Sequence, residues 1–170
     1  MVTDVRTAPE LDEAAILAAL ADVPDPEIPV VSIVELGMVE RVEIGTAGIR
    51  VELLPTFVGC PAVEMIRSAV AERLAVFGRP VEVDLSYRVP WTSDRISPQG
   101  REKLRVSGFA PPTGTADARG PILLSTEPPV PCPFCGSRRT VLDNAFGPTR
   151  CRSIHYCASC RQPFEQFKNV

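Results

Sequence analysis

The sequence predicts an α+β protein: a small domain with the element order α-β-β-α-β, followed by a second, cysteine-rich module. Residues 48–54 and 81–87 alternate apolar and polar side chains, the period-2 pattern of strands with one buried face. Between them, residues 61–77 place apolar side chains at helical spacing. Two CxxC motifs in residues 131–170 predict a module folded around a metal ion rather than around a large core.

The first helix is expected over Glu10–Ala21. Pro9 suits its start, because the N–H that proline lacks has no partner in a first helical turn. Three prolines in residues 24–29 exclude a regular helix or a central strand there, and Val31–Leu36 is expected to be a short apolar stretch closed by Gly37. The helix face expected to be buried carries Leu11, Ala14, Leu17 and Ala18, with Leu20 beside them.

Two strands and a helix are expected in the middle of the domain. Met38–Ile44 and Gly48–Leu54 are predicted to pair, because the three residues between them make a link of hairpin length. Pro61 suits the first position of the following helix, which is expected to end at Phe77. Val81–Tyr87 then supplies a third strand.

A last short helix is expected after the third strand. Ser97 suits its N-cap, Pro98 its first position and Gly108 its end. Trp91, the only tryptophan, is expected to anchor packing rather than to bind a cofactor.

These patterns divide the chain into three parts. Residues 1–112 are predicted to form the α+β domain, residues 113–130 a linker, and residues 131–170 the four-cysteine module. Six of the eighteen prolines fall in and beside the linker, so we expect it to be semi-stiff, with any order centred on Ile122–Leu124.

The two CxxC motifs are separated by 21 residues and contain Cys132, Cys135, Cys157 and Cys160. Zinc prefers four such ligands in a closed tetrahedron, with Zn–S near ~2.3 Å. Val141–Ala145 and Ile154–Tyr156 are expected to form the connecting hairpins, and the whole predicts a zinc ribbon. An iron–sulfur site that uses the same thiolates is the alternative. Four cysteine ligands leave no open position, so the ion is expected to be structural.

Cys60 is expected on the strand-to-helix loop, at or beside the N-cap of the helix that opens at Pro61. The N–H donors and partial positive charge of a helix N-terminus stabilise a thiolate and lower its pKa. Cys60 is therefore a candidate nucleophile, soft-metal ligand or redox thiol. The alternative is a small buried apolar side chain.

Cys151 and His155 are left over from the metal module. Cys151 lies six residues before Cys157, too far to share its motif, so it is either buried filler or a separate functional thiol. His155, the only histidine, is expected to be a surface or packing residue. No base is expected near Cys60, and the chain has no phosphate loop, dinucleotide fingerprint or hydrolase motif, so we expect no catalysis.

Composition indicates a soluble globular protein, with 45% apolar and 23% charged residues. The chain has no membrane-length apolar run and no signal-like N-terminus, so we expect it in the cytoplasm, where its six cysteines indicate metal binding rather than disulfides. Residues 131–170 carry a charge of +4 and the remainder −7, so the two parts are expected to attract each other or an outside partner. A mildly basic tail is weak evidence for nucleic acid, and we do not expect nucleic-acid binding.

Several motifs together resemble known families. Three segments resemble the iron–sulfur-assembly domain of SufT and the cytosolic iron–sulfur targeting proteins: Asp25–Val30, Val34–Val39 and Pro55–Pro61. Three more extend the resemblance: Trp91–Asp94, Gly108–Pro112 and Phe164–Lys168. The whole chain resembles the PaaD family, accessory proteins encoded with the multicomponent phenylacetyl-CoA 1,2-epoxidase of aerobic phenylacetate degradation.

The resemblance implies a role in maturation rather than in ring oxidation. The epoxidase relies on a di-iron oxygenase subunit and a reductase subunit with a flavin and an iron–sulfur cluster, and these subunits are the implied partners. Cys60 would be the reactive or cluster-handling thiol. The residues implied to shape its pocket are Asp25, Glu27, Thr56 and Gly59.

Two functional hypotheses follow. In the first, Cys60 and Cys151 transiently hold iron or an iron–sulfur cluster and pass it to an epoxidase component; a homodimer that pairs two Cys60 residues is the variant of this idea. In the second, the protein is a metal-independent docking adaptor that stabilises the epoxidase components.

Overall fold

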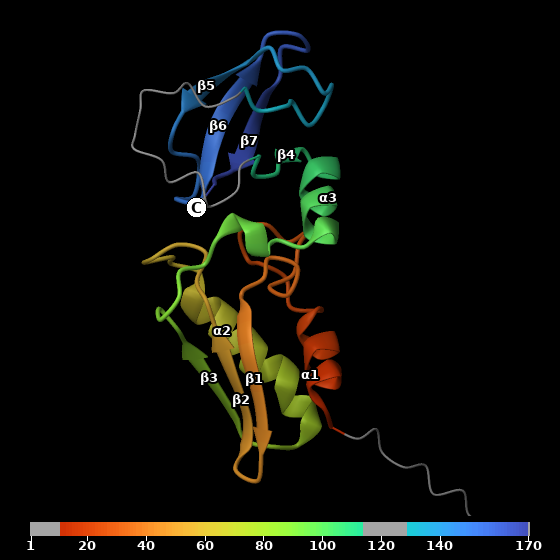
Figure 1. The fold of residues 1–170 in the computed structure, drawn as a ribbon, viewed down its shortest axis with the longest axis vertical. Helices are drawn as coiled ribbons and strands as arrows, with labels where there is room; N and C mark the ends of the chain where they lie inside the picture. The colour runs from red at the N-terminus through yellow and green to blue at the C-terminus, as the bar shows by residue number, and fades with distance from the viewer. Residues whose placement is uncertain (1–10, 114–128, 170) are drawn as a thin grey trace, which may run out of the picture.

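The computed structural model describes residues 11–113 and 129–169. It contains a three-stranded sheet in the order β1-β2-β3 and a four-stranded sheet in the order β4-β7-β6-β5 (Figure 1). The two sheets and the helices α1, α2 and α3 confirm the predicted α+β class. No helix in the described part of the chain has the length and apolar content needed to cross a bilayer.

The first sheet follows the predicted order closely. β1 (Val39–Gly45) pairs antiparallel with β2 (Gly48–Leu53), and β2 pairs parallel with β3 (Val81–Leu85). The parallel pair requires a crossover connection, which α2 (Val63–Leu74) provides. Helices α1 (Glu13–Leu20) and α2 cover one face of this sheet (Figure 1).

The predicted buried face of the first helix is partly wrong, because Leu20 is buried as expected but the two alanines named with it are not. α1 is capped by Asp12, whose carboxylate accepts a hydrogen bond from the backbone N–H of Ala15, and it starts at Glu13 rather than Glu10. Its buried residues are Ile16, Ala19 and Leu20, whereas Ala14 and Ala18 are exposed. The helix is apolar almost all round, so its sequence does not distinguish one face from the other.

The second helix begins later than predicted. Cys60, Pro61 and Ala62 form a turn, and α2 starts at Val63 with Ala62 as its N-cap. The helix continues as the 3-10 turn Ala75–Phe77. The residues buried from it are Val63, Ile66, Val70 and Leu74.

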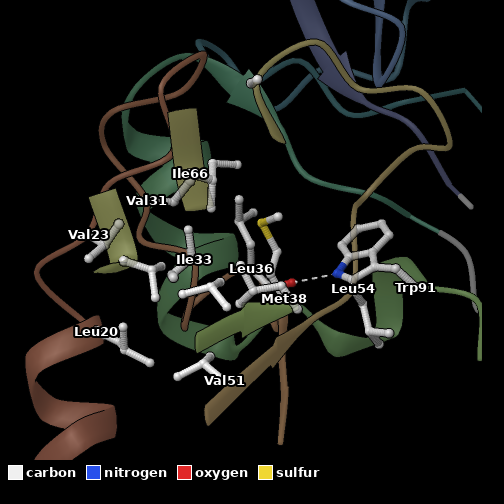
Figure 2. Packing of buried hydrophobic residues seen from close by; sticks show 14 of the residues in the cluster. Leu20, Val23, Val31, Ile33, Leu36, Met38, Val51, Leu54, Ile66 and Trp91 are labelled. Atoms are coloured by element: carbon white, nitrogen blue, oxygen red, sulfur yellow. Dashed lines mark hydrogen bonds between the residues drawn. The ribbon is translucent and has the colours of Figure 1, made fainter. Parts of the chain in front are cut away.

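The apolar stretch Val31–Leu36 forms turns rather than a strand, and its side chains fill the centre of the core (Figure 2). The indole N–H of Trp91 donates a hydrogen bond of 2.8 Å to the carbonyl of Leu36, which confirms the predicted anchoring role. On its other side, the Trp91 ring lies 5.7 Å from the ring of Phe167, at the end of β7 (Pro163–Phe167). One core therefore runs from the α+β domain into the cysteine-rich module.

The last helix and the second sheet connect the two modules. α3 (Pro98–Val106) has the predicted cap, because the Ser97 hydroxyl accepts a hydrogen bond from the N–H of Gly100. The 3-10 turn Ser93–Arg95 precedes it. Directly after α3, β4 (Phe109–Ala110) pairs parallel with β7, so strand pairing begins before residue 112.

Two hairpin strands complete the second sheet. β5 (Thr140–Asn144) pairs with β6 (Arg152–Cys157), and β6 pairs with β7, both antiparallel. These strands agree with the hairpins predicted between the CxxC motifs. The predicted linker falls almost entirely outside the described residues, including Ile122–Leu124.

Candidate functional sites

The four CxxC cysteines converge at one end of the second sheet. The Sγ atoms of Cys132, Cys135, Cys157 and Cys160 all lie within 4.8 Å of one another. Two of the Sγ–Sγ separations are 3.6 Å (Cys132 to Cys160) and 3.7 Å (Cys135 to Cys157). A tetrahedral zinc with Zn–S near 2.3 Å places its sulfur ligands about 3.8 Å apart. The donor set and its spacing therefore fit one zinc ion, closed on all sides by sulfur.

Both CxxC turns use the same backbone geometry. The N–H of Gly136 donates to the carbonyl of Cys132, and the N–H of Arg161 donates to the carbonyl of Cys157, each at 2.8 Å. Gly136 and Arg161 have φ of 71° and 60°, in the left-handed region. Arg161 is the one non-glycine residue with positive φ among the described residues. Hydrogen bonds from the N–H groups of Cys160 and Ser159 lower the pKa of Cys157 to about 6, which prepares a thiolate for metal binding.

A second site lies where the two modules meet. A cavity of about 250 Å³ separates the β2–α2 loop from the loop between β5 and β6. Of the residues singled out in the sequence, Cys60, Cys151, Glu27 and Thr56 line it. The structure thus brings together the two thiols that the metal ribbon leaves unused.

Cys60 is half-buried in this cavity, and its predicted activation by the helix is wrong for the metal-free protein. Burial raises the pKa of the Cys60 thiol. The N–H groups of Ala62 and Val63, at the start of α2, lower this pKa, while the carboxylates of Glu27 and Asp25 raise it, and the net result is an increase. The N-terminus of α2 lowers the pKa of Cys60, but burial and the two carboxylates raise it by more.

Cys151 is 7% exposed and has polar neighbours. Its Sγ lies 3.1 Å from the hydroxyl oxygen of Thr149 and 3.9 Å from Oε2 of Glu27. Arg152 Nε donates to the same Thr149 oxygen at 2.8 Å, which leaves the Thr149 proton free to point at the sulfur. Burial raises the pKa of Cys151, and the Thr149 hydroxyl opposes this. Cys151 is therefore buried, as expected of a filler residue. It also lines a cavity, which a separate functional thiol needs.

Asp25 and Gly59 do not line the cavity, but they shape the turns that carry Glu27 and Cys60. The Asp25 carboxylate accepts hydrogen bonds from the N–H groups of Glu27 and Ile28, at 2.9 and 2.8 Å. This turn holds Glu27 in place, and burial raises the pKa of Asp25. Gly59 has φ of 78°, which lets the chain turn just before Cys60.

Comparison with known proteins matches both modules. Residues 13–85 match the family model described as an iron–sulfur cluster assembly protein, and residues 116–168 match the PaaD zinc beta ribbon domain. The chain is also 41% identical, over 157 residues, to a protein of Escherichia coli K12 named as a putative subunit of 1,2-phenylacetyl-CoA epoxidase. That alignment covers 91% of this chain and 92% of the relative. The chain belongs to the PaaD family.

Solved structures resemble the first module of this PaaD-family chain. A protein of the domain of unknown function DUF59 from Bacillus anthracis superposes with a TM-score of 0.51 at 30% identity, covering 54% of this chain and 90% of that one. A conserved hypothetical protein from Thermotoga maritima gives a TM-score of 0.50 at 32% identity, covering 58% and 98%. Each of these structures covers little more than half of this chain.

The ribbon side of the cavity contains residues that the sequence analysis missed. The loop of residues 146–150 lines it, with Phe146 and Arg150 among its members. Lys168 fixes this loop by donating to the carbonyl of Arg150 at 2.9 Å, and its ammonium lies 4.8 Å from the centre of the Phe146 ring. In the sequence, the dipeptide Gly147-Pro148 predicts a turn between two strands. It does not indicate what that turn contacts. His155, as predicted, is a packing residue: it is buried and stacked on Phe164.

Proposed function

We propose that this PaaD-family protein is a non-catalytic maturation factor for a phenylacetyl-CoA 1,2-epoxidase complex in aerobic phenylacetate catabolism. It transiently holds iron or an iron–sulfur cluster and delivers it to the oxygenase or the reductase subunit. The metal is cargo, and Cys60 with Cys151 holds it. The site of action is the cytoplasm, where the epoxidase would be assembled.

The observation that carries this proposal is the cavity between the modules, where two thiols from different parts of the chain face the same space. A carrier has to release its cargo. Ligands supplied by two modules allow release when the modules shift relative to each other, whereas four cysteines within one ribbon do not. The remaining four thiols of the chain form that ribbon cluster.

The comparisons support the two halves of the proposal separately. The first module matches an iron–sulfur cluster assembly family, which supports metal or cluster handling. The relative in Escherichia coli is named as a subunit of a phenylacetyl-CoA epoxidase, which supports the partners. In this scheme zinc is the resident ion: Cys132, Cys135, Cys157 and Cys160 would hold it, and it would fix the fold of the ribbon.

Metal analysis of anaerobically isolated protein tests the carrier. Iron, zinc and acid-labile sulfide per chain are measured in the wild type and in the variants Cys60→Ala and Cys151→Ala. We expect about one zinc in all three proteins and iron in the wild type alone. Zinc without iron in the wild type, together with full epoxidase maturation in cells that carry Cys60→Ala, would contradict the proposal.

A docking adaptor is the second candidate, and one observation favours it. Phe146 lines the cavity and is 71% exposed, and Val58, in the loop that carries Thr56 and Cys60 on the other module, is 74% exposed. Exposed apolar side chains of this size mark surfaces that bind other proteins. If docking is the whole function, Val58→Ser and Phe146→Ser abolish co-purification with the epoxidase subunits, and Cys60→Ala leaves maturation intact.

A further inference from the structure

We propose that Cys60, Cys151 and Glu27 form a three-ligand site for a single ferrous ion, rather than for a preassembled cluster. This inference rests on the proposed carrier function, which supplies the identity of the metal as iron. The ligand set and the nuclearity come from the cavity itself.

The number of thiols decides between an ion and a cluster. The chain has six cysteines, and four of them have their sulfurs within 4.8 Å of one another in the ribbon. Two thiols, Cys60 and Cys151, remain for the cavity. A [2Fe–2S] or [4Fe–4S] cluster takes four protein ligands, whereas Cys60, Cys151 and Glu27 supply three, so a cluster here would need a ligand from a second chain. A single divalent ion needs three or four ligands and can be bound within one chain.

Glu27 supplies the third ligand. Its carboxylate lines the cavity, and its Oε2 atom lies 3.9 Å from Sγ of Cys151. A thiolate and a carboxylate oxygen bound tetrahedrally to one ion, at about 2.3 and 2.1 Å, lie about 3.6 Å apart. The observed separation is close to this value, so a small movement of either side chain places both on one ion.

The surroundings keep Glu27 and Cys151 in place. Two backbone N–H groups bind Asp25 and fix the turn that carries Glu27. The hydrogen bonds from Arg152 to Thr149 and from Thr149 to Cys151 fix the sulfur on the ribbon side. Glu27 and Cys151 are thus each positioned by hydrogen bonds from residues that would not touch the ion, as is usual for metal ligands.

The charges suit a divalent cation. Two thiolates and one carboxylate carry −3, and a ferrous ion reduces this to −1. The Arg150 side chain borders the same cavity and offsets the remainder. A mixed sulfur and oxygen set disfavours magnesium and calcium, which prefer oxygen ligands throughout. Three protein ligands also leave one open position, through which a recipient protein can take the ion, unlike the closed zinc site.

Anaerobic titration with ferrous sulfate tests the site on the full-length, zinc-loaded protein. Bound iron and acid-labile sulfide are measured after desalting, and X-ray absorption at the iron edge reports the ligands. We expect about one iron per chain, no sulfide, and a shell of two sulfurs near 2.3 Å together with oxygen.

Glu27→Gln is the decisive variant, with Glu72→Gln, at an exposed position on α2, as its matched control. Glu27→Gln should weaken iron binding about tenfold or more, and Glu72→Gln should leave it unchanged. Circular dichroism and the count of alkylatable thiols establish that both variants are folded.

The outcomes separate this inference from the proposed function. Stoichiometric sulfide with four sulfur ligands per iron would overturn the single-ion site and leave the carrier function standing. Wild-type affinity in Glu27→Gln, with loss of binding in Cys60→Ala, would remove Glu27 as a ligand and again leave the carrier. The absence of both iron and sulfide would overturn the inference and the carrier together.

Discussion

Burial, together with the acids beside them, sets the protonation of the two cavity thiols in the metal-free protein. For Cys60 and Cys151, burial is the largest cause of a raised pKa, and the Glu27 carboxylate adds to it in both cases. At neutral pH both thiols are therefore protonated, and little thiolate is present. A cation that binds between them reverses this balance, because it replaces the protons and compensates the charge of Glu27.

Removing the charge of Glu27 should lower the pKa of both thiols. In Glu27→Gln, we expect the pH midpoint of alkylation by iodoacetamide to fall, and the rate at pH 8 to rise roughly two- to tenfold, because one unit of pKa is a tenfold change in thiolate. Rates of modification at Cys60 and Cys151 are followed by mass spectrometry on protein with an iron-free cavity and the ribbon zinc in place. Glu72→Gln serves as the control. An unchanged midpoint in Glu27→Gln would show that the Glu27 charge contributes nothing, and that burial and the Asp25 carboxylate raise these pKa values.

Arg161 carries backbone strain in the second CxxC turn. A non-glycine residue at φ of 60° costs about 1 kcal/mol or more, and glycine adopts the same angle freely, as Gly136 does in the first turn. We expect Arg161→Gly to raise the free energy of unfolding of the zinc-loaded protein by about 0.5–1 kcal/mol relative to Arg161→Ala. The comparison with alanine isolates the backbone effect, since both variants lose the guanidinium. Equal denaturation midpoints for the two variants would contradict the inference that the backbone at position 161 is strained.

At the scale of the elements, periodic patterns predict position better than orientation. The hairpin of β1 and β2, the third strand and the capped α3 were predictable because each has a local signal: alternation, a short link, or Ser97 before Pro98. The buried face of α1 was not, because an alanine-rich helix is apolar on every side.

Only the side of the cavity that the α+β domain provides could be predicted from the sequence. Glu27, Thr56 and Cys60 belong to motifs near one another in the α+β domain. Thr149 and Arg150 reach the cavity through contacts between modules, for which the sequence has no local pattern. The sequence marks Cys151 as a thiol outside the metal motifs, but its place in the same cavity as Cys60 depends on how the ribbon packs on the domain.

Gly37 marks a close approach between two elements. A Cβ at Gly37 would lie 2.4 Å from the carbonyl oxygen of Arg95, in the 3-10 turn that precedes α3. Gly78 has the same φ of 65° with nothing within 4 Å of its Cβ position. We therefore expect Gly37→Ala to lower the free energy of unfolding by about 3 kcal/mol or more, and Gly78→Ala by about 1 kcal/mol. Urea denaturation of both variants measures the difference, and similar losses would mean that φ alone sets the cost.

At the scale of the whole molecule, the ribbon completes the core of the domain. Cys151 and Phe167 belong to the same buried cluster as Leu36, Ile66 and Trp91. The α+β domain therefore provides half of the cavity, and the ribbon provides the other half together with the cover over Trp91. We therefore expect the structural metal and the candidate cargo site to be coupled through this packing, although they use different cysteines.

Removing the ribbon zinc should open the cavity. The ribbon has a small core of its own, so without its metal we expect it to unfold and to withdraw Phe167 from Trp91. Trp91 is the only tryptophan and is 4% exposed, so its fluorescence reports this junction directly, and the emission should shift to the red on chelation. Cys151 should become alkylatable at the same time, while circular dichroism retains the helical signal of α1 and α2. Added zinc should reverse both changes. Unshifted Trp91 emission after complete zinc removal would mean that the junction is stable without the metal and that the two sites are independent.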